Sequence, residues 1–228
     1  MLAKLTEGNF GSWGEFVEHV AASTVTDASS HSRYSLDWYG GVTWEQALKL
    51  AVAGWPEGMA HVERFTSTLV DRLSDSLLID DYHYDVTGLD FDLDRVLNGE
   101  PEAWLVAEQV EVKAPANQLV RIQVNSVCSG GIDAKILIQR GAAIAALVML
   151  LERARRRVEV DLVICNGWEK DNWCKVTVCL KSAGQDLDLA KLVFALAHPA
   201  SFRRLYFAWM ERQGKEFRDY FGVYAGKG

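Results

Sequence analysis

The stretch "VRIQVNSVCSGGIDAKILIQRGAAIAALVMLLERARRRVEVDLVIC", from Val120 to Cys165, decides the fold class. It contains an apolar strand-like run, a glycine turn, a long alanine-rich segment and a second strand-like run. Two strands joined by a helix favour parallel pairing through a right-handed crossover. We therefore predict a βαβ unit, with strands at 120–126 and 158–165 and a helix at 133–156.

The flanking sequence extends this unit in both directions. A strand at 174–181 follows the "NGWEKDNW" turn as a hairpin, and helices are predicted at 187–196 and 201–220. Before the unit, Ser12 with Glu15 and Thr43 with Gln46 match capping boxes and predict helices from 13 and 44. The second of these ends at Gly54-Trp55-Pro56, a third helix is expected at 57–73, and short strands with tight turns at 77–113.

These elements predict an α/β protein with a mixed sheet, preceded by a small tryptophan-rich α+β segment. The linker candidate "KAPANQ", residues 113–118, divides the chain into segments 1–118 and 119–228, which are separate or packed as one unit. Residues 121–228 hold 17 Lys or Arg and 11 Asp or Glu, whereas residues 1–120 hold 7 and 20. This asymmetry indicates modules that attract each other, within or between chains, or an acidic half that restrains a basic surface from binding nucleic acid.

The long helix is predicted to be a core element. Leu147 and Leu150 are expected to be buried against the sheet. Gly141 lies inside the helix, where glycine is about 1 kcal/mol less favourable than alanine, so we expect a close contact that a methyl group would obstruct. That contact is either internal or part of an oligomer interface.

Cysteine spacing and hydropathy limit the class of protein. The four cysteines include no C-x-x-C pair, so we expect reduced thiols, no metal site and no cofactor. The longest uninterrupted apolar run, 142–151, is shorter than the roughly 20 residues that cross a bilayer. With no signal-peptide pattern at the N-terminus, we expect a cytoplasmic protein without a membrane partner.

The order of strand, small-residue turn, long helix and "RRRVEVDLV" resembles the first half of a von Willebrand factor A-like domain. That family carries Asp-x-Ser-x-Ser after its first strand, where oxygen ligands hold a divalent ion. The matching positions are Asn125, Val127 and Ser129, so only the last serine is retained. The resemblance therefore implies a metal site that has been lost.

Seven side chains are candidate binding residues: Arg153, Arg155, Arg156, Arg157, His198, Arg203 and Arg204. The first four close the long helix, where cations also interact with the helix dipole. That interaction accounts for one or two of them and leaves the others for a basic surface that contacts phosphates or the acidic half. For His198, capping or packing is the alternative to binding a phosphate or carboxylate.

Three stretches resemble an uncharacterised group of phage and prophage proteins: "TWEQALKLAVAGWPEG" (43–58), "VLNGEPEAW" (96–104) and "HPASFRR" (198–204). The resemblance implies a phage or prophage context and the cytoplasm of the host cell, but no activity. The five histidines are scattered and none lies in a nucleophile motif. We therefore predict a non-enzymatic interaction or assembly protein that binds another protein or itself.

Two alternatives stay open. One is a nucleic-acid-binding protein that uses a surface of residues 153–157 and 203–204, which the net charge of −7 disfavours. The other is an enzyme with an unrecognised site.

Overall fold

The computed structural model describes residues 4–22, 36–76, 78–111, 118–129, 131–168 and 172–213. The chain forms two compact units: unit 1 takes Met1–Thr66 and Ala116–Gly228, and unit 2 takes Ser67–Pro115. This differs from the predicted division at residue 118, although one unit boundary does fall within the linker candidate. The N-terminal part and the C-terminal half of the chain belong to one unit because the chain leaves unit 1 and later returns to it.

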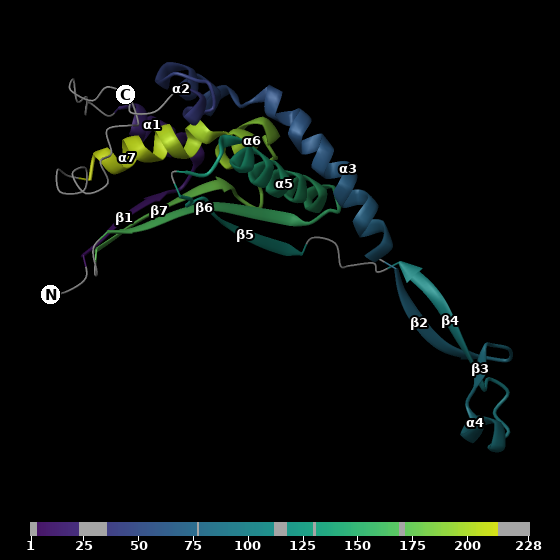
Figure 1. Ribbon diagram of the computed structural model, residues 1–228. Coiled ribbons are helices and arrows are strands. Elements are labelled where there is room, and N and C mark those ends of the chain that lie inside the picture. The colour runs from purple at the N-terminus through teal and green to yellow at the C-terminus, as the bar shows by residue number, and fades with distance from the viewer. Residues whose placement is uncertain are drawn as a thin grey trace. The chain divides into compact units, whose positions relative to one another are not determined.

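Unit 1 contains a four-stranded mixed sheet in the order β1-β7-β6-β5 (Figure 1). Its strands are β1 (Lys4–Phe10), β5 (Leu119–Asn125), β6 (Arg157–Trp168) and β7 (Asn172–Lys181). β5 and β6 are parallel and flank the helix α5 (Ala134–Arg153), whereas β6 and β7 are antiparallel. The mixed α/β class and the parallel pairing of the βαβ strands are confirmed.

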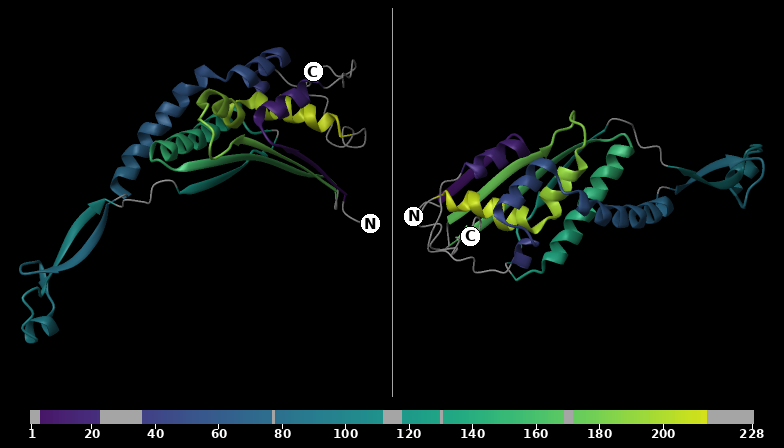
Figure 2. Two further views of the ribbon diagram at one scale, coloured as in Figure 1. Left: turned by 180° about the vertical axis from the view of Figure 1, so that it is seen from behind. Right: turned by 90° about the horizontal axis from the view of Figure 1, so that it is seen from above.

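The helices of unit 1 lie on one face of this sheet (Figures 1 and 2). Besides α5 they are α1 (Trp13–Ala21), α2 (Trp44–Ala53), α6 (Leu189–Ala197), the π-helical segment η3 (Ser201–Tyr206) and α7 (Phe207–Glu211). Alternate residues of the central strands are buried beneath them: Val158, Val160, Leu162, Ile164, Cys174, Val176 and Val178. This period of two is typical of a sheet with one face in the core.

The strand β1 was not predicted. It pairs with β7 in parallel, from Lys4 opposite Asn172 to Phe10 opposite Val178. A Cβ added at Gly8 would lie 2.7 Å from the Trp209 ring, so glycine allows this strand to pack directly under the indole. The contact joins the two ends of the described chain.

The caps predicted from sequence are present at the first two helices. Ser12 Oγ accepts a hydrogen bond from Glu15 N at 3.1 Å, and Thr43 forms the full reciprocal box with Gln46. α2 ends at Gly54, which has a φ of 90°. The 3₁₀ turn η2 (Pro56–Gly58) and α3 (Met59–Ser76) follow, and the turn η1 (Leu36–Tyr39) precedes α2.

The helix α5 packs through small residues. A Cβ added at Gly141 would lie 2.1 Å from the Leu196 carbonyl oxygen, so the expected close contact exists and is internal, to α6. The expectation for Leu147 is wrong, because its side chain is 40% exposed. The inner side of α5 is taken by small side chains, and a helix that is apolar nearly all round gives no periodicity to indicate which side faces inward.

By length and composition α5 is also the one described helix that would suffice to cross a membrane. Interior helices and signal sequences pass the same test, and 33% of the apolar window of α5 is buried, including Gly141, Ala142, Ala145 and Ala146. The apolar run 142–151 considered above is shorter than this helix, because Arg140 and Gly141 precede it.

Unit 2 contains a three-stranded antiparallel sheet in the order β2-β4-β3. Its elements are β2 (Leu78–Asp85), β3 (Asp90–Phe91), the short helix α4 (Leu93–Leu97) and β4 (Trp104–Glu111). β2 pairs with β4 from Leu78 opposite Glu111 to Asp85 opposite Trp104. Strands with short connections were expected here, whereas α4 was not.

Candidate functional site

Arg203 and Arg204 lie in the interior, not on a basic surface. Both are at most 3% exposed. Arg203 donates to the carbonyl oxygens of Trp38, at 2.7 Å, and Ile132, and its guanidinium stacks over the Trp38 ring. Arg204 donates to the Val42 carbonyl at 2.9 Å and stacks over Tyr39. The two arginines hold the backbone of residues 38–42 against η3, which corrects their predicted place on an exposed binding surface.

His198 is also part of the core. Its Nδ1 accepts a hydrogen bond from Ala200 N at 3.1 Å, and its ring stacks on Phe194 and meets the edge of Trp55. Burial lowers the pKa of His198 to about 4. The imidazole is therefore neutral at physiological pH and fits the capping and packing alternative.

The remaining candidates lie where α5 ends and β6 begins. Arg153, Arg155 and Arg157 are exposed, while Arg156 donates to Gln118 Oε1 at 3.0 Å. The neighbouring carboxylates are engaged elsewhere, since Glu152 pairs with Lys181 at 2.7 Å and Glu159 with Arg121 at 2.6 Å. We call Arg153 and Arg155 the arginine surface; Arg157 precedes the buried Val158 in β6, so its side chain lies on the face of the sheet away from the helices. Without Arg203 and Arg204, the predicted nucleic-acid interface loses two of its phosphate contacts.

The positions predicted for a lost metal site, Asn125, Val127 and Ser129, lie at the carboxyl end of β5 and in the loop that follows it. Asn125 Oδ1 accepts a hydrogen bond from Val127 N at 2.9 Å, and Ser129 Oγ accepts one from Gly131 N at 3.4 Å. Both side chains serve the turn that leads into α5. No three His, Cys, Asp or Glu side chains within the described residues are grouped so that they could hold a metal ion.

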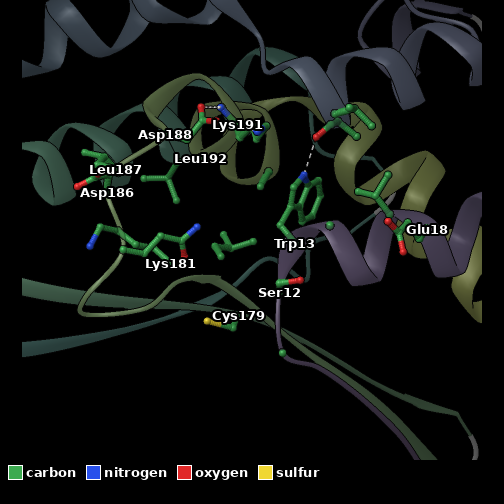
Figure 3. Close-up of a pocket in the computed structure, with 18 residues that line it drawn as sticks. Ser12, Trp13, Glu18, Cys179, Lys181, Asp186, Leu187, Asp188, Lys191 and Leu192 are labelled. Carbon is green, nitrogen blue, oxygen red and sulfur yellow. Dashed lines mark hydrogen bonds and ion pairs between the residues drawn. The ribbon is translucent and has the colours of Figure 1, made fainter.

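A cavity of about 290 Å³ lies between α1, α2, α6 and the end of β7 (Figure 3). Trp13 forms part of its apolar wall, with its indole N–H donated to the Ala51 carbonyl at 2.8 Å. Lys181 donates to Glu152, to the Val158 carbonyl at 3.0 Å and to the Ser182 carbonyl at 3.2 Å. All three protons of this ammonium group therefore have partners within the protein, so Lys181 stabilises the cavity wall and is not free to react.

Other polar side chains also line the cavity. Asp188 caps α6 and pairs with Lys191 at 2.9 Å. Burial raises the pKa of the Cys179 thiol, which favours its protonated, unreactive form. The arrangement suits binding of a small amphipathic group. Sequence reasoning missed this cavity because its walls come from segments that are distant in the chain.

Unit 2 presents the largest accumulation of exposed apolar side chains. We define the hairpin tip as residues 82–108, in which only Ala103 is buried. Leu89 is 91% exposed and Leu97 75%, and further side chains are at least 38% exposed: Tyr82, Tyr84, Val86, Phe91, Leu93, Val96 and Trp104. Exposed apolar side chains gathered in one part of a chain are a candidate interaction site. In the sequence these residues alternate with aspartates, and the pattern predicted short strands with tight turns but not the exposure of the apolar side chains.

Polar contacts order the hairpin tip locally. Asp92 caps α4 through the amides of Asp94 and Arg95 and accepts a hydrogen bond from the Tyr84 hydroxyl at 3.0 Å. The hydrogen bond from the Arg95 amide is the main reason why the pKa of Asp92 is lowered. Arg95 stacks over Tyr84 and pairs with Glu100 at 3.1 Å. These contacts fix the backbone while the apolar side chains face outward.

Comparison with known proteins gives a family but no activity. No curated protein and no solved structure shows significant similarity to the chain. A family model described as "Domain of unknown function (DUF7192)" matches residues 3–227, across both units and the candidate sites described above. The chain therefore belongs to the DUF7192 family of domains of unknown function.

Proposed function

We propose that this chain is a non-enzymatic interaction protein of phage or prophage origin, which binds a protein partner through the hairpin tip. The observation that carries the proposal is the exposure of nine large apolar side chains in residues 82–108, where only Ala103 is buried. Exposing Leu89 and Leu97 to water is unfavourable by roughly 25 cal/mol for each Å² of apolar surface. A protein partner that covers them removes this cost.

The stability of small sheets supports the same conclusion. A two-stranded hairpin is marginally stable in water, and a small sheet becomes stable with three or more strands that have a hydrophobic face, or by packing against a helix. In unit 2 the third strand, β3, is only two residues long, and both its residues are exposed. A bound partner would therefore both cover the apolar side chains and stabilise the sheet.

The negative charge of the hairpin tip indicates which kind of surface a partner would present. The hairpin tip holds seven carboxylates and one arginine, so a surface that is both apolar and basic complements it. Unit 1 is the scaffold in this proposal. The relation of its β5–α5–β6 unit to von Willebrand factor A-like domains, the phage context and the host cytoplasm are parts of the proposal, supported by the sequence resemblances given above.

The test compares proteins captured from extracts of the natural host by the purified chain and by two variants. Leu89→Asp with Leu97→Asp places two charges in the hairpin tip, whereas Gly184→Asp changes a turn in unit 1 where an added Cβ would meet no atom within 4 Å. We expect captured proteins that are lost with the tip variant and retained with Gly184→Asp. Identical captured sets for all three baits would refute the proposal.

A further inference from the structure

We infer that the partner of the hairpin tip is a second copy of this chain, bound at the outer surface of α5. This inference rests on the proposed function, because it names the partner of the same surface. The receiving surface consists of Ile136, Leu147 and the arginine surface at the carboxyl end of the helix. It provides both properties that the tip requires, an apolar area and an adjacent group of cations.

The apolar part of the receiving surface follows from helix geometry. Ile136 is 52% exposed and Leu147 40%. They are eleven residues apart, which at about 100° per residue places them on nearly the same line along the helix. The opposite side of α5 is buried against α6 through Gly141, so the exposed line is not the one that packs in the core.

The charged part lies at the end of that helix. No described carboxylate pairs with Arg153 or Arg155, and the neighbouring Glu152 is engaged with Lys181. The tip offers matching anions in Asp94 and Glu102, which are exposed and form no ion pair with the residues that the structure describes. Apolar surface thus faces apolar surface, and cations face carboxylates.

The backbone conformation of Arg155 also points to a role for this residue at the receiving surface. Its φ is 58°, and it is the one described non-glycine residue with a positive φ. The amides of Arg155 and Arg156 close the end of α5 by bonding to the carbonyls of Glu152 and Leu151. Glycine is the residue that this conformation favours, and strained positions of this kind concentrate at functional sites. The end of α5 imposes this conformation. We infer that arginine stands here in place of glycine because its guanidinium contacts the partner.

The chemistry favours a second copy over an unrelated protein because this chain carries both complementary surfaces. Residues 67–115 hold 12 Asp or Glu and 3 Lys or Arg, whereas the rest of the chain holds 19 and 21. The tip of one copy can therefore bind the α5 surface of another copy.

The test uses sedimentation equilibrium of the purified full chain over a range of concentrations, with charge reversal on each surface. The tip variant combines Asp94→Lys with Glu102→Lys, and the α5 variant combines Arg153→Glu with Arg155→Glu. The control, Glu7→Lys with Glu63→Lys, makes the same change in net charge as the tip variant at exposed sites outside both surfaces. We expect the wild type and the control to self-associate, and added salt to weaken the association.

Each reversed variant alone should raise the dissociation constant by at least about tenfold, because like charges then face each other. An equimolar mixture of the two variants should associate again, since each tip then meets an α5 surface of opposite charge. A wild type that stays monomeric at all concentrations would overturn the inference, as would a mixture that fails to associate. If the wild type is monomeric while the Leu89→Asp and Leu97→Asp change still abolishes capture of another protein, the proposed function stands and only the inferred partner is wrong.

Discussion

Two residues of α5 show how single positions determine this structure. Gly141 has no side chain because the carbonyl of Leu196 occupies the space where a Cβ would stand. Arg155 has a side chain although its backbone conformation favours glycine. Gly141 allows α5 and α6 to pack closely within unit 1. We infer that Arg155 contributes its guanidinium to the arginine surface.

Gly141→Ala is expected to destabilise the protein despite the better helix propensity of alanine. The added methyl group would lie within 2.3 Å of backbone atoms of Leu196 and Ala197, so α5 and α6 must move apart. Overpacking of this kind costs about 1 to 3 kcal/mol, against about 1 kcal/mol gained in propensity. Urea denaturation measures the difference. An increase in stability, with an unchanged solution mass, would refute the internal contact.

Arg155→Gly is expected to have the opposite effect on stability. Relief of the positive φ should stabilise the fold by about 1 kcal/mol. The matched control is Arg153→Gly, inside the last turn of α5, which should destabilise by up to about 1 kcal/mol. Urea denaturation of both variants decides the sign. We also expect Arg155→Gly to weaken self-association, so that the more stable variant associates less well than the wild type. A variant that gains stability and still associates as strongly as the wild type would exclude Arg155 from the interface.

At the level of elements, the junction between α6 and η3 fixes the segment around η1. His198 ends α6, and Arg203 and Arg204 extend from η3 to the carbonyls of Trp38 and Val42. The chain from Leu36 to Val42 is thereby attached to the C-terminal elements, which explains why its residues belong to unit 1.

The pH dependence of stability should report this junction. The pKa of His198 falls from 6.5 to about 4 on folding, so the unfolded chain takes up a proton at a higher pH than the folded protein. The contribution of His198 to the free energy of unfolding is therefore complete above about pH 6.5. It decreases by about 3 kcal/mol as the pH falls to about 4. His198→Gln cannot titrate and should show a flatter dependence in this window. Equal slopes for variant and wild type would show that His198 is not buried in its neutral form.

A pair of leucines tests which side of α5 faces the core. Leu137 is 6% exposed and Leu147 40%, in the same helix. Leu137→Ala should cost about 2 to 5 kcal/mol, whereas Leu147→Ala should cost less than about 1 kcal/mol. Thermal and urea unfolding of the two variants provide the comparison. A larger loss at Leu147 would restore the original expectation that it packs against the sheet.

Elements with local signals could be predicted from the sequence, whereas those defined by distant contacts could not. The strands of the βαβ unit, α5 and the caps at Ser12 and Thr43 follow from patterns within a few residues. β1 was missed because its short, polar and glycine-containing sequence becomes a strand only beside β7. The burial of Arg203 was not predictable, since its hydrogen-bond partners are backbone carbonyls that carry no signature in the sequence.

At the scale of the whole molecule, the charge asymmetry has a different origin from the one first inferred. The acidic character of residues 1–120 resides mainly in unit 2, which holds 12 of the 20 carboxylates in that half. A boundary at residue 118 divides the core of unit 1 because charge alone does not reveal that the chain returns to it. The functional candidates separate along the same division, with a packed scaffold in unit 1 and an exposed, acidic and apolar surface in unit 2.

The most direct test of the central claim, that the hairpin tip binds a protein, is site-specific photo-crosslinking in living host cells. A photoreactive residue replaces Leu97, which is 75% exposed in the tip, or Gly184 in unit 1 as the control. Mass spectrometry of the adducts identifies the protein bound at each site. We predict a discrete protein adduct at position 97, with a second copy of the chain as its partner, and none at position 184. No adduct at position 97, or the same adducts at both positions, would contradict the claim.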